Sequence, residues 1–225
     1  MIPWQLVDTA AVAASGAALR LYKRGAEFSI RVENRELMNN RVHGSEDTLA
    51  ELACARIADR PRPRVLIGGL GMGYTLAAAL RRLRGEAQVL VAELVPAVVA
   101  WNRGPLADLA GHPLADRRVT VREVDVAQIL REGQQGYDAI MLDVDNGPEG
   151  LTVTSNDWLY ARAGLVAAFA ALRPTGVLAV WSVAPNRAFA QRLRRVGFTV
   201  AEVRVAARGS HGGERRTVWI AERGP

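Results

Sequence analysis

The sequence predicts an α/β fold in which a mostly parallel sheet of seven strands has helices on both faces. Three observations lead to this prediction. From residue 63 onward, short apolar segments alternate with segments of helical periodicity. The apolar segments have no polar side, which is typical of parallel strands buried between two layers of helices. The first of them runs into a glycine-rich turn, and a helix follows.

The region before residue 63 has the pattern of a small antiparallel sheet. Residues 19–23 and 27–32 alternate apolar and polar side chains around Arg24 and Gly25, which predicts a β-hairpin. Residues 36–38 predict a short third strand, and Ser45 is a candidate N-cap of a helix. The predicted parts are a small N-terminal β-domain over residues 1–44, a connecting helix and linker over residues 45–62, and a Rossmann-like α/β domain over residues 63–225.

The α/β region contains five predicted strands, each followed by a helix, and then two further strands. The five strands cover residues 65–67, 89–92, 119–121, 137–142 and 177–181. The helices cover residues 74–83, 97–101, 126–130, 157–172 and 186–196. The last two strands, over residues 198–205 and 217–221, predict an antiparallel edge of the sheet.

A glycine-rich loop and two carboxylates follow the first three strands of this region. The loop needs glycine because its backbone turns sharply and lets a ligand approach the start of a helix. Glu93 follows the second strand, where an acidic residue binds ribose hydroxyls in nucleotide-binding folds, and Asp125 follows the third, where a carboxylate can accept an adenine amino group. We therefore predict a nucleoside-binding domain whose cofactor residues are Gly68, Gly69, Gly71, Gly73, Glu93 and Asp125.

The spacing of the glycines favours one kind of nucleoside. A dinucleotide fingerprint needs a third glycine where Tyr74 stands, and no Gly-Lys-Ser/Thr sequence of a P-loop is present. The Gly-x-Gly-x-Gly pattern from Gly69 to Gly73 suits a cofactor of the S-adenosylmethionine type.

Composition narrows the classes of protein further. Hydrophobic residues make up 49% and charged residues 23% of the 225, which excludes a disordered or fibrous chain. We expect neither a membrane-spanning helix nor a signal peptide, and a single cysteine fits the reducing cytoplasm. The three histidines lie far apart and predict no metal site, and no Gly-x-Ser-x-Gly elbow of a serine hydrolase occurs.

The net charge of +6 raises the question of nucleic acid as a partner. Two sets of arginines fall at the ends of predicted helices, where cations complement the helix dipole. Because the carboxylates gather at the predicted site, the charge pattern favours a small cationic substrate over nucleic acid.

Several segments resemble the spermidine synthase (polyamine aminopropyltransferase) family over most of the chain. The similar segments are the N-terminal β-domain, the glycine loop with its strand over residues 65–73, Ala92-Glu93-Leu94, residues 137–143 running into Gly147-Pro148, and residues 172–178. The resemblance implies a class I methyltransferase-like core, decarboxylated S-adenosylmethionine as aminopropyl donor, a diamine acceptor and a homodimer.

The sequence differs from the family at two positions that the family uses for its chemistry. Gly71 stands where the family has an aspartate that pairs with the donor's terminal ammonium. The active-site loop of the family has the pattern Asp-x-x-Asp-Pro, and its second aspartate is the catalytic base. In this sequence Asn146 stands at the position of that base, and Asp145 lies one residue before Asn146. An amide cannot accept a proton at neutral pH. We therefore identify Asp143, Asp145 and Asn146 as the candidate catalytic residues, with Asp145 as a substitute base.

Other residues complete the expected pocket for an amine. Glu46 would contribute a carboxylate, and Trp158 and Tyr160 would supply aromatic walls that attract a cation.

The differences from the family leave three functional alternatives open. The chain transfers an aminopropyl group, it uses ordinary S-adenosylmethionine to methylate a small molecule or RNA, or it is a nucleoside-binding assembly protein without activity.

Overall fold

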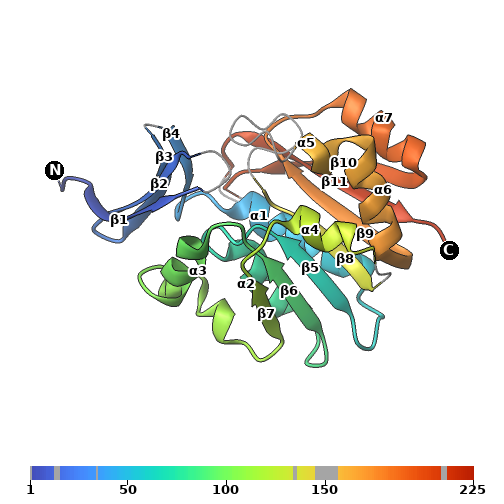
Figure 1. Ribbon diagram of the computed structural model, residues 1–225, viewed down its shortest axis with the longest axis horizontal. Helices are drawn as coiled ribbons and strands as arrows, with labels where there is room; N and C mark the ends of the chain where they lie inside the picture. The colour runs from blue at the N-terminus through green and yellow to red at the C-terminus, as the bar shows by residue number, and fades with distance from the viewer. Residues whose placement is uncertain (1, 13–15, 34, 134–135, 145–156, 209–211) are drawn as a thin grey trace.

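The computed structural model describes residues 2–12, 16–33, 35–133, 136–144, 157–208 and 212–225. These residues form two sheets, a four-stranded one near the N-terminus and a seven-stranded one with helices packed on it (Figure 1). No helix in the described ranges has the length and apolar character that a membrane span needs.

The N-terminal sheet is antiparallel, with its strands in chain order. It contains β1 (Gln5–Ala11), β2 (Ala18–Arg24), β3 (Glu27–Val32) and β4 (Arg35–Asn39). The predicted hairpin and third strand are therefore confirmed as β2 to β4, whereas the largely exposed edge strand β1 was not predicted. Helix α1 (Gly44–Arg56) follows; its N-cap is His43 and not the predicted Ser45.

The large sheet has the strand order β10-β11-β9-β8-β5-β6-β7. Its strands are β5 (Arg64–Gly68), β6 (Gln88–Ala92), β7 (Val119–Arg122), β8 (Tyr137–Leu142), β9 (Leu172–Ser182), β10 (Phe198–Ala206) and β11 (Arg215–Arg223). Strands β5 to β9 pair in parallel, and β11 pairs antiparallel with both β9 and β10. The predicted seven-stranded, mostly parallel sheet is confirmed, with the antiparallel strand β11 one place in from the edge.

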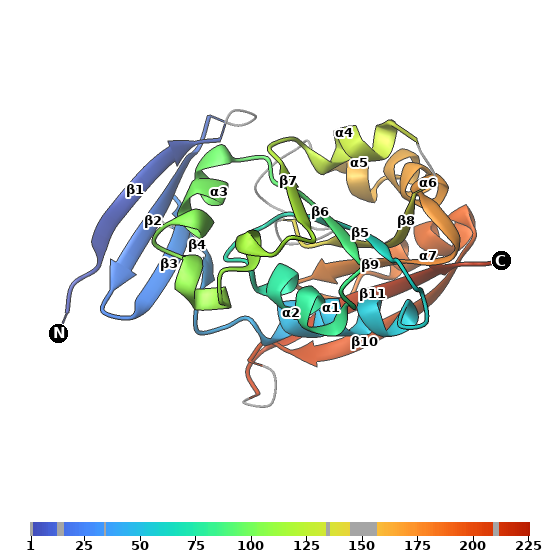
Figure 2. The same ribbon diagram turned by 90° about the horizontal axis from the view of Figure 1, so that it is seen from below.

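Helices cover both faces of this sheet, as Figure 2 shows from below. The helices are α2 (Tyr74–Arg82), α3 (Pro96–Arg103), α4 (Val126–Arg131), α5 (Asp157–Tyr160), α6 (Arg162–Ala171) and α7 (Arg187–Val196). Neighbouring residues of β5 enter different cores: Val65 and Ile67 pack with α1, α2 and α3, and Leu66 packs with α4, α6 and α7. This alternation explains why the strands are apolar on both sides. The predicted long helix over residues 157–172 is divided at Ala161, whose backbone is extended.

The N-terminal sheet shares a core with one face of the large sheet. Leu21 and Ile30 of the small sheet belong to the same cluster of buried side chains as Val65 of β5 and Leu49 of α1. Figure 1 shows that β1 to β4 lie beside the edge where the parallel strands β5 and β6 end. The open edge of the large sheet, where a fold of this class binds its ligand, is therefore flanked by a second sheet.

Candidate functional site

The glycine loop between β5 and α2 has the backbone conformation that its sequence predicts. The φ angles are +88° at Gly69, +53° at Gly71 and +84° at Gly73, in the region that favours glycine. A Cβ atom on Gly69 would lie 2.4 Å from the carbonyl oxygen of Asp143, and one on Gly68 would lie 2.9 Å from Cγ2 of Val126. The loop is therefore held tightly between the ends of neighbouring elements.

Glu93 lies directly after β6 and anchors this loop. Its Oε2 accepts a hydrogen bond of 2.9 Å from the backbone N–H of Leu70, and its Oε1 accepts one of 2.8 Å from Val95. The side chain is buried, with 7% of its surface exposed. Each carboxylate oxygen has a second lone pair, so the group can also accept hydroxyl hydrogens from a ligand. The sequence predicted the position of Glu93 but not its role in fixing the loop.

Asp125 is the N-cap of α4, three residues after the end of β7. Its Oδ1 accepts a 2.8 Å hydrogen bond from the backbone N–H of Ala127. The carboxylate therefore stabilises the start of the helix and stays at the open edge of the sheet.

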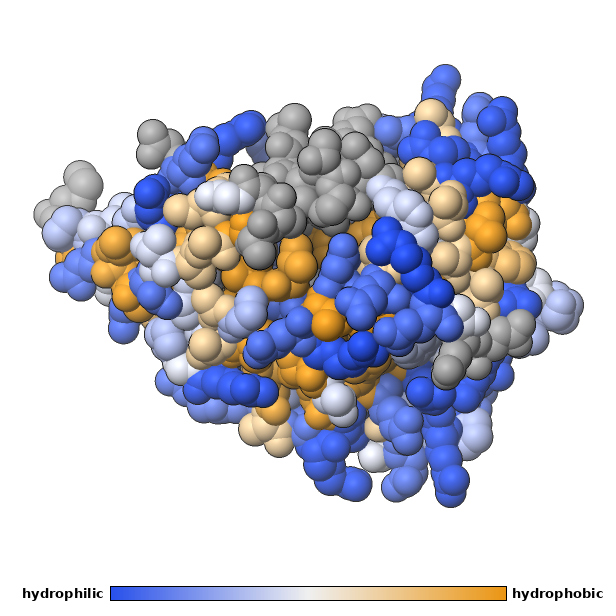
Figure 3. Space-filling model, in the orientation of Figure 1, coloured by the Kyte–Doolittle hydropathy of each residue, from blue (hydrophilic) through white to orange (hydrophobic). Residues whose placement is uncertain are grey.

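The predicted cofactor residues converge on one cleft, which we call the glycine-loop cleft. Gly69, Gly71, Glu93 and Asp125 line it together with Asp143, around a volume of about 140 Å³. Its remaining wall consists of apolar side chains, several of them from the N-terminal sheet: Val12, Ala17, Leu19, Ile30, Val32, Leu37, Met38, Ala92, Leu94, Val95, Val98, Val126 and Val144. Figure 3 shows apolar surface between the two sheets on this side of the molecule. Carboxylates beside apolar walls suit the ribose and the base of a nucleoside. Gly68 and Gly73 shape the loop without being among the described lining residues of the cleft.

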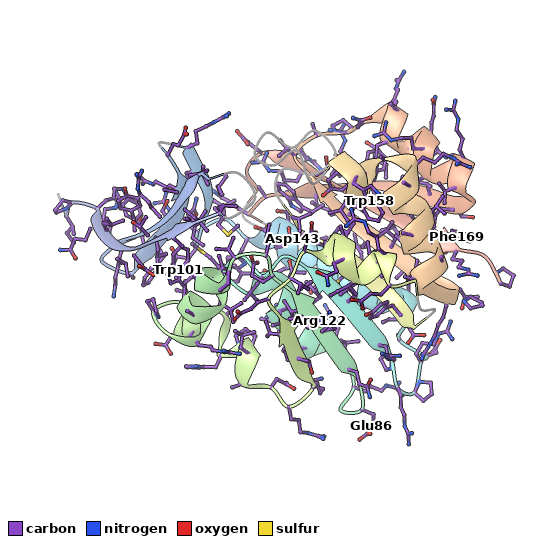
Figure 4. The ribbon with its side chains drawn as sticks, viewed as in Figure 1. Glu86, Trp101, Arg122, Asp143, Trp158 and Phe169 are labelled. Atoms are coloured by element: carbon purple, nitrogen blue, oxygen red, sulfur yellow. The ribbon has the colours of Figure 1, made fainter. Side chains whose placement is uncertain are left out.

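A larger cavity of about 810 Å³ adjoins this cleft, and we call it the Glu46 cavity. Both spaces are lined by Leu37, Met38, Gly71 and Asp143, so the two spaces meet at these four residues, and we call this shared boundary the passage. Figure 4 shows Asp143 at the end of β8, on the side of the large sheet that faces β1 to β4.

Two carboxylates of the Glu46 cavity have raised pKa values. Burial raises the pKa of Asp143 to about 6, although Thr75 Oγ1 donates a 2.6 Å hydrogen bond to its Oδ2. Burial and the neighbouring charge of Asp143 raise the pKa of Glu46 to about 7. Ser45 Oγ lies 2.5 Å from Glu46 Oε2, so the hydroxyl predicted as a helix cap instead holds this carboxylate. A pair of buried carboxylates attracts a cation and can exchange protons near neutral pH.

The aromatic residues predicted to bind the substrate do not line either space in the described part of the chain. Tyr160 is buried, donates a 3.2 Å hydrogen bond to the carbonyl of Val144, and packs edge-on against Phe189. Trp158 lies under the guanidinium of Arg131, 4.1 Å from the ring centroid, and Figure 4 shows it away from Asp143. Both side chains pack in the second core because α5 turns them toward α4 and α7. Asp145 and Asn146 lie outside the described residues.

Sequence reasoning missed four residues that line the Glu46 cavity: Met38, Tyr74, Thr75 and Trp181. Tyr74 and Thr75 are the first two residues of α2. Their position directly after the glycine loop is the sequence signal that could have identified them as site residues. Met38 comes from the N-terminal sheet and lies against Gly71, where a Cβ atom would be 3.1 Å from its sulfur. No pattern in the sequence indicates this contact between distant segments.

In the described residues, no group of three or more His, Cys, Asp or Glu is arranged to hold a metal ion. Many arginines pair with acids on neighbouring elements, as Arg81 does with Asp47 and Arg82 with Glu51.

Comparison with solved structures identifies the fold as that of class I methyltransferases. A carbon methyltransferase, CurJ, matches with a TM-score of 0.58 and 14% identity, over 80% of this chain and 54% of its own. The spermidine synthase of Thermotoga maritima matches with a TM-score of 0.77 and 16% identity, over 98% of this chain and 73% of its own. A probable spermidine synthase from Corynebacterium glutamicum matches with a TM-score of 0.66 and 13% identity, over 97% of this chain and 79% of its own. The chain thus has the fold of the spermidine synthases, including the N-terminal sheet.

Sequence comparison points in the same direction over a shorter stretch. Polyamine aminopropyltransferase 1 of Streptomyces coelicolor is 39% identical over 85 residues, which are 37% of this chain and 16% of that protein. The match therefore spans less than a fifth of this relative's length. No family model matches the chain.

Proposed function

We propose that the protein is an aminopropyltransferase, which transfers the aminopropyl group of decarboxylated S-adenosylmethionine to a small amine. The observation that carries this proposal is the passage at Asp143, where a cleft suited to a nucleoside adjoins a cavity with paired carboxylates. A transfer from a nucleoside donor to a cationic acceptor needs these two spaces side by side.

The residues of the glycine-loop cleft fit the nucleoside part of such a donor. Glu93 would accept hydrogen bonds from the ribose hydroxyls, and Asp125 would accept one from the adenine amino group. The apolar side chains of the N-terminal sheet would cover the base and exclude water. When bound, the donor supplies an electrophilic carbon next to a sulfonium.

The Glu46 cavity fits an amine. Asp143 and Glu46 would hold the ammonium group and compensate its charge in a partly buried place. Tyr74 and Trp181 would contact the alkyl chain of the amine with their rings. Two further carboxylates of the cavity, Glu36 and Glu214, favour an acceptor with more than one amino group.

Methyl transfer from ordinary S-adenosylmethionine is the second candidate, and Gly71 favours it. With Met38 against Gly71, the passage has no carboxylate where the related family has an aspartate for the donor's ammonium.

Binding of methylthioadenosine, the nucleoside product, tests the assignment of the cleft. We expect calorimetry to detect binding to the wild-type chain, weakened about tenfold or more in Glu93→Gln, because hydrogen bonds to a charged acceptor contribute about 1.5–3 kcal/mol each. Glu86→Gln is the matched control, since Glu86 is exposed at the opposite end of the sheet (Figure 4). Failure of the wild-type chain to bind any adenosylmethionine derivative would refute the proposal.

We further propose that two chains associate as a homodimer. The edge strand β1 and Ile2, which lies three residues before it, expose large apolar side chains: Leu6 is 56%, Val7 41% and Ile2 63% exposed. Exposed apolar residues on an unpaired edge favour association with another copy. Light scattering should give twice the mass of the chain, and a monomer that persists at high concentration would refute this assignment.

A further inference from the structure

Four carboxylates among the described residues line the Glu46 cavity, and each of them has a hydrogen-bond or ion-pair partner. Glu36 accepts hydrogen bonds from Ser29 Oγ at 2.6 Å and from Asn39 Nδ2 at 2.7 Å. Glu214 is largely exposed and pairs with Arg216 at 2.8 Å. Glu36 and Glu214 are bound to groups at the sides of the cavity, whereas Asp143 acts on Glu46 through its charge, so we take Glu46 and Asp143 as the pair that meets an incoming amine.

The two members of this pair are held in different ways. Asp143 follows β8, its backbone N–H bonds to the carbonyl of Gly68, and its carboxylate receives the hydroxyl of Thr75 from α2. It is fixed from two neighbouring elements at the passage. Glu46 lies in the first turn of α1 and its carboxylate is held by Ser45, the residue next to it. A hydroxyl can rotate to donate to a carboxylate or to accept from a carboxylic acid, so this contact survives a change of protonation.

We propose that Glu46 is the catalytic base, which removes a proton from the attacking ammonium, while Asp143 remains charged and holds it. This inference rests on the proposed function. It also accounts for Asn146, which stands where the related family has its base and which cannot accept a proton. The raised pKa of Glu46, at about 7, supports the assignment because a base works best when its pKa is near the working pH.

The proposed aminopropyl transfer moves one proton and one electron pair. The ammonium gives one proton to the carboxylate of Glu46 and becomes a neutral amine with a lone pair. The nitrogen then bonds to the carbon beside the sulfonium as the carbon–sulfur bond breaks, and the electron pair of that bond stays on sulfur. The new secondary amine leaves as a cation, and Glu46 later releases its proton to water. Oxidation and reduction play no part.

The charged and titratable groups around Glu46 come from several elements. Those near it are His43, Asp47, Tyr74 and Asp143, and the wider cavity adds Glu36, Glu214, Arg208 and Arg216. The His43 ring stacks on Tyr74, its Nδ1 lies 2.8 Å from Asp47 Oδ2, and its charge acts to lower the pKa of Glu46. Asp143 is the group that raises the pKa of Glu46 by its charge.

Proton release on amine binding tests the inference without turnover. Binding of 1,4-diaminobutane near pH 6.5 should expel the proton that free Glu46 retains, and calorimetry in buffers of different ionisation enthalpy measures this release. We expect the release to fall by at least half in Glu46→Gln and to persist in the control Glu51→Gln, which changes an exposed residue of the same helix. Unchanged release in Glu46→Gln would overturn the inference.

Turnover with decarboxylated S-adenosylmethionine and the same diamine provides the second test. We expect Glu46→Gln to lower kcat by about 100-fold or more with a small change in KM, and to remove the decrease of kcat at low pH; general base catalysis typically contributes about 10²–10⁴-fold. Glu46→Asp should recover part of kcat. If Glu46→Gln keeps its kcat and pH profile while Asp145→Asn loses them, Asp145 is the base and the inference is wrong. A wild-type chain without any turnover would refute the proposed function instead, and the proton-release result would still decide the role of Glu46.

Discussion

Two carboxylates of the glycine-loop cleft and two of the Glu46 cavity differ in the groups that donate hydrogen bonds to them. Glu93 and Asp125 accept hydrogen bonds from backbone N–H groups of Leu70, Val95 and Ala127. Glu46 and Asp143 accept hydrogen bonds from the side-chain hydroxyls of Ser45 and Thr75, and the Glu46 carboxylate accepts a further one from its own backbone N–H. Backbone donors cannot rotate away or accept a proton, whereas hydroxyls can do both.

This difference suits the carboxylates of the cleft to ligand binding and those of the cavity to proton transfer. Carboxylates fixed by the backbone are permanent acceptors at set positions, as recognition of a nucleoside requires. The hydroxyl-held pair lies close together in a partly buried cavity and has pKa values raised to about 7 and about 6. We propose that the two spaces have different tasks, and the following substitutions test them separately.

The largest effect is expected from Gly69→Ala, which alters the glycine loop where it lines the glycine-loop cleft. The new Cβ would meet the Asp143 carbonyl at 2.4 Å, on a backbone with φ of +88°. Strain and overpacking of this kind cost roughly 2–5 kcal/mol. Urea unfolding should show this loss, with methylthioadenosine binding also weakened. Gly85→Ala is the control because its Cβ would have space. Wild-type stability in Gly69→Ala would contradict the tight packing of the loop.

Thr75→Val should affect the Glu46 cavity and spare the cleft. The change keeps the shape of the side chain and removes the hydroxyl that donates to Asp143. A hydrogen bond to a charged group contributes about 1.5–3 kcal/mol, so kcat/KM for the amine should fall by roughly 10- to 100-fold. Calorimetry should show methylthioadenosine binding within a factor of about two of wild type. Equal losses of kcat/KM for the amine and of methylthioadenosine affinity would mean that the two spaces are not independent.

Stability should depend on pH through the Glu46 cavity. The pKa of Glu46 is raised from its ordinary value of 4.5 to about 7 in the folded chain. Its contribution to the free energy of unfolding is fully present below the ordinary value and is lost as the pH rises toward 7. Glu46→Gln should therefore stabilise the chain by about 2 kcal/mol at pH 8 relative to wild type, after a discount for partial exposure, and by little at pH 4. Denaturant titrations at both pH values measure this difference, and Glu51→Gln should show no such trend.

The smallest effect is expected at Asp125, where two substitutions separate its structural role from its role in binding. Asp125→Ala removes the N-cap of α4 and should cost about 1 kcal/mol in unfolding experiments. Asp125→Asn keeps the cap, and should weaken nucleoside binding about threefold to tenfold without a change in stability. Equal binding losses in both variants, each in proportion to its loss of stability, would assign Asp125 to structure alone.

The sequence predicted the elements of the large sheet because its buried strands and helices have regular patterns. It also predicted Glu93, Asp125 and Asp143, since residues that follow parallel strands meet at one edge of the sheet. It could not predict that Met38 faces Gly71, because that contact depends on how the N-terminal sheet packs on the large one. Trp158 and Tyr160 were misjudged since the break at Ala161 sets the direction of α5 and could not be detected in an apolar helical pattern. The boundaries at residues 44 and 62 and the roles of Asp145 and Asn146 stay predictions.

The nucleoside product that the purified chain forms with each donor tests the proposed aminopropyl transfer most directly. The chain is incubated with 1,4-diaminobutane and either decarboxylated or ordinary S-adenosylmethionine, and the products are identified by mass spectrometry. We predict methylthioadenosine and an aminopropylated diamine with the decarboxylated donor, and no methylated amine with the ordinary one. Formation of S-adenosylhomocysteine with a methylated acceptor, or no product from either donor, would contradict the account.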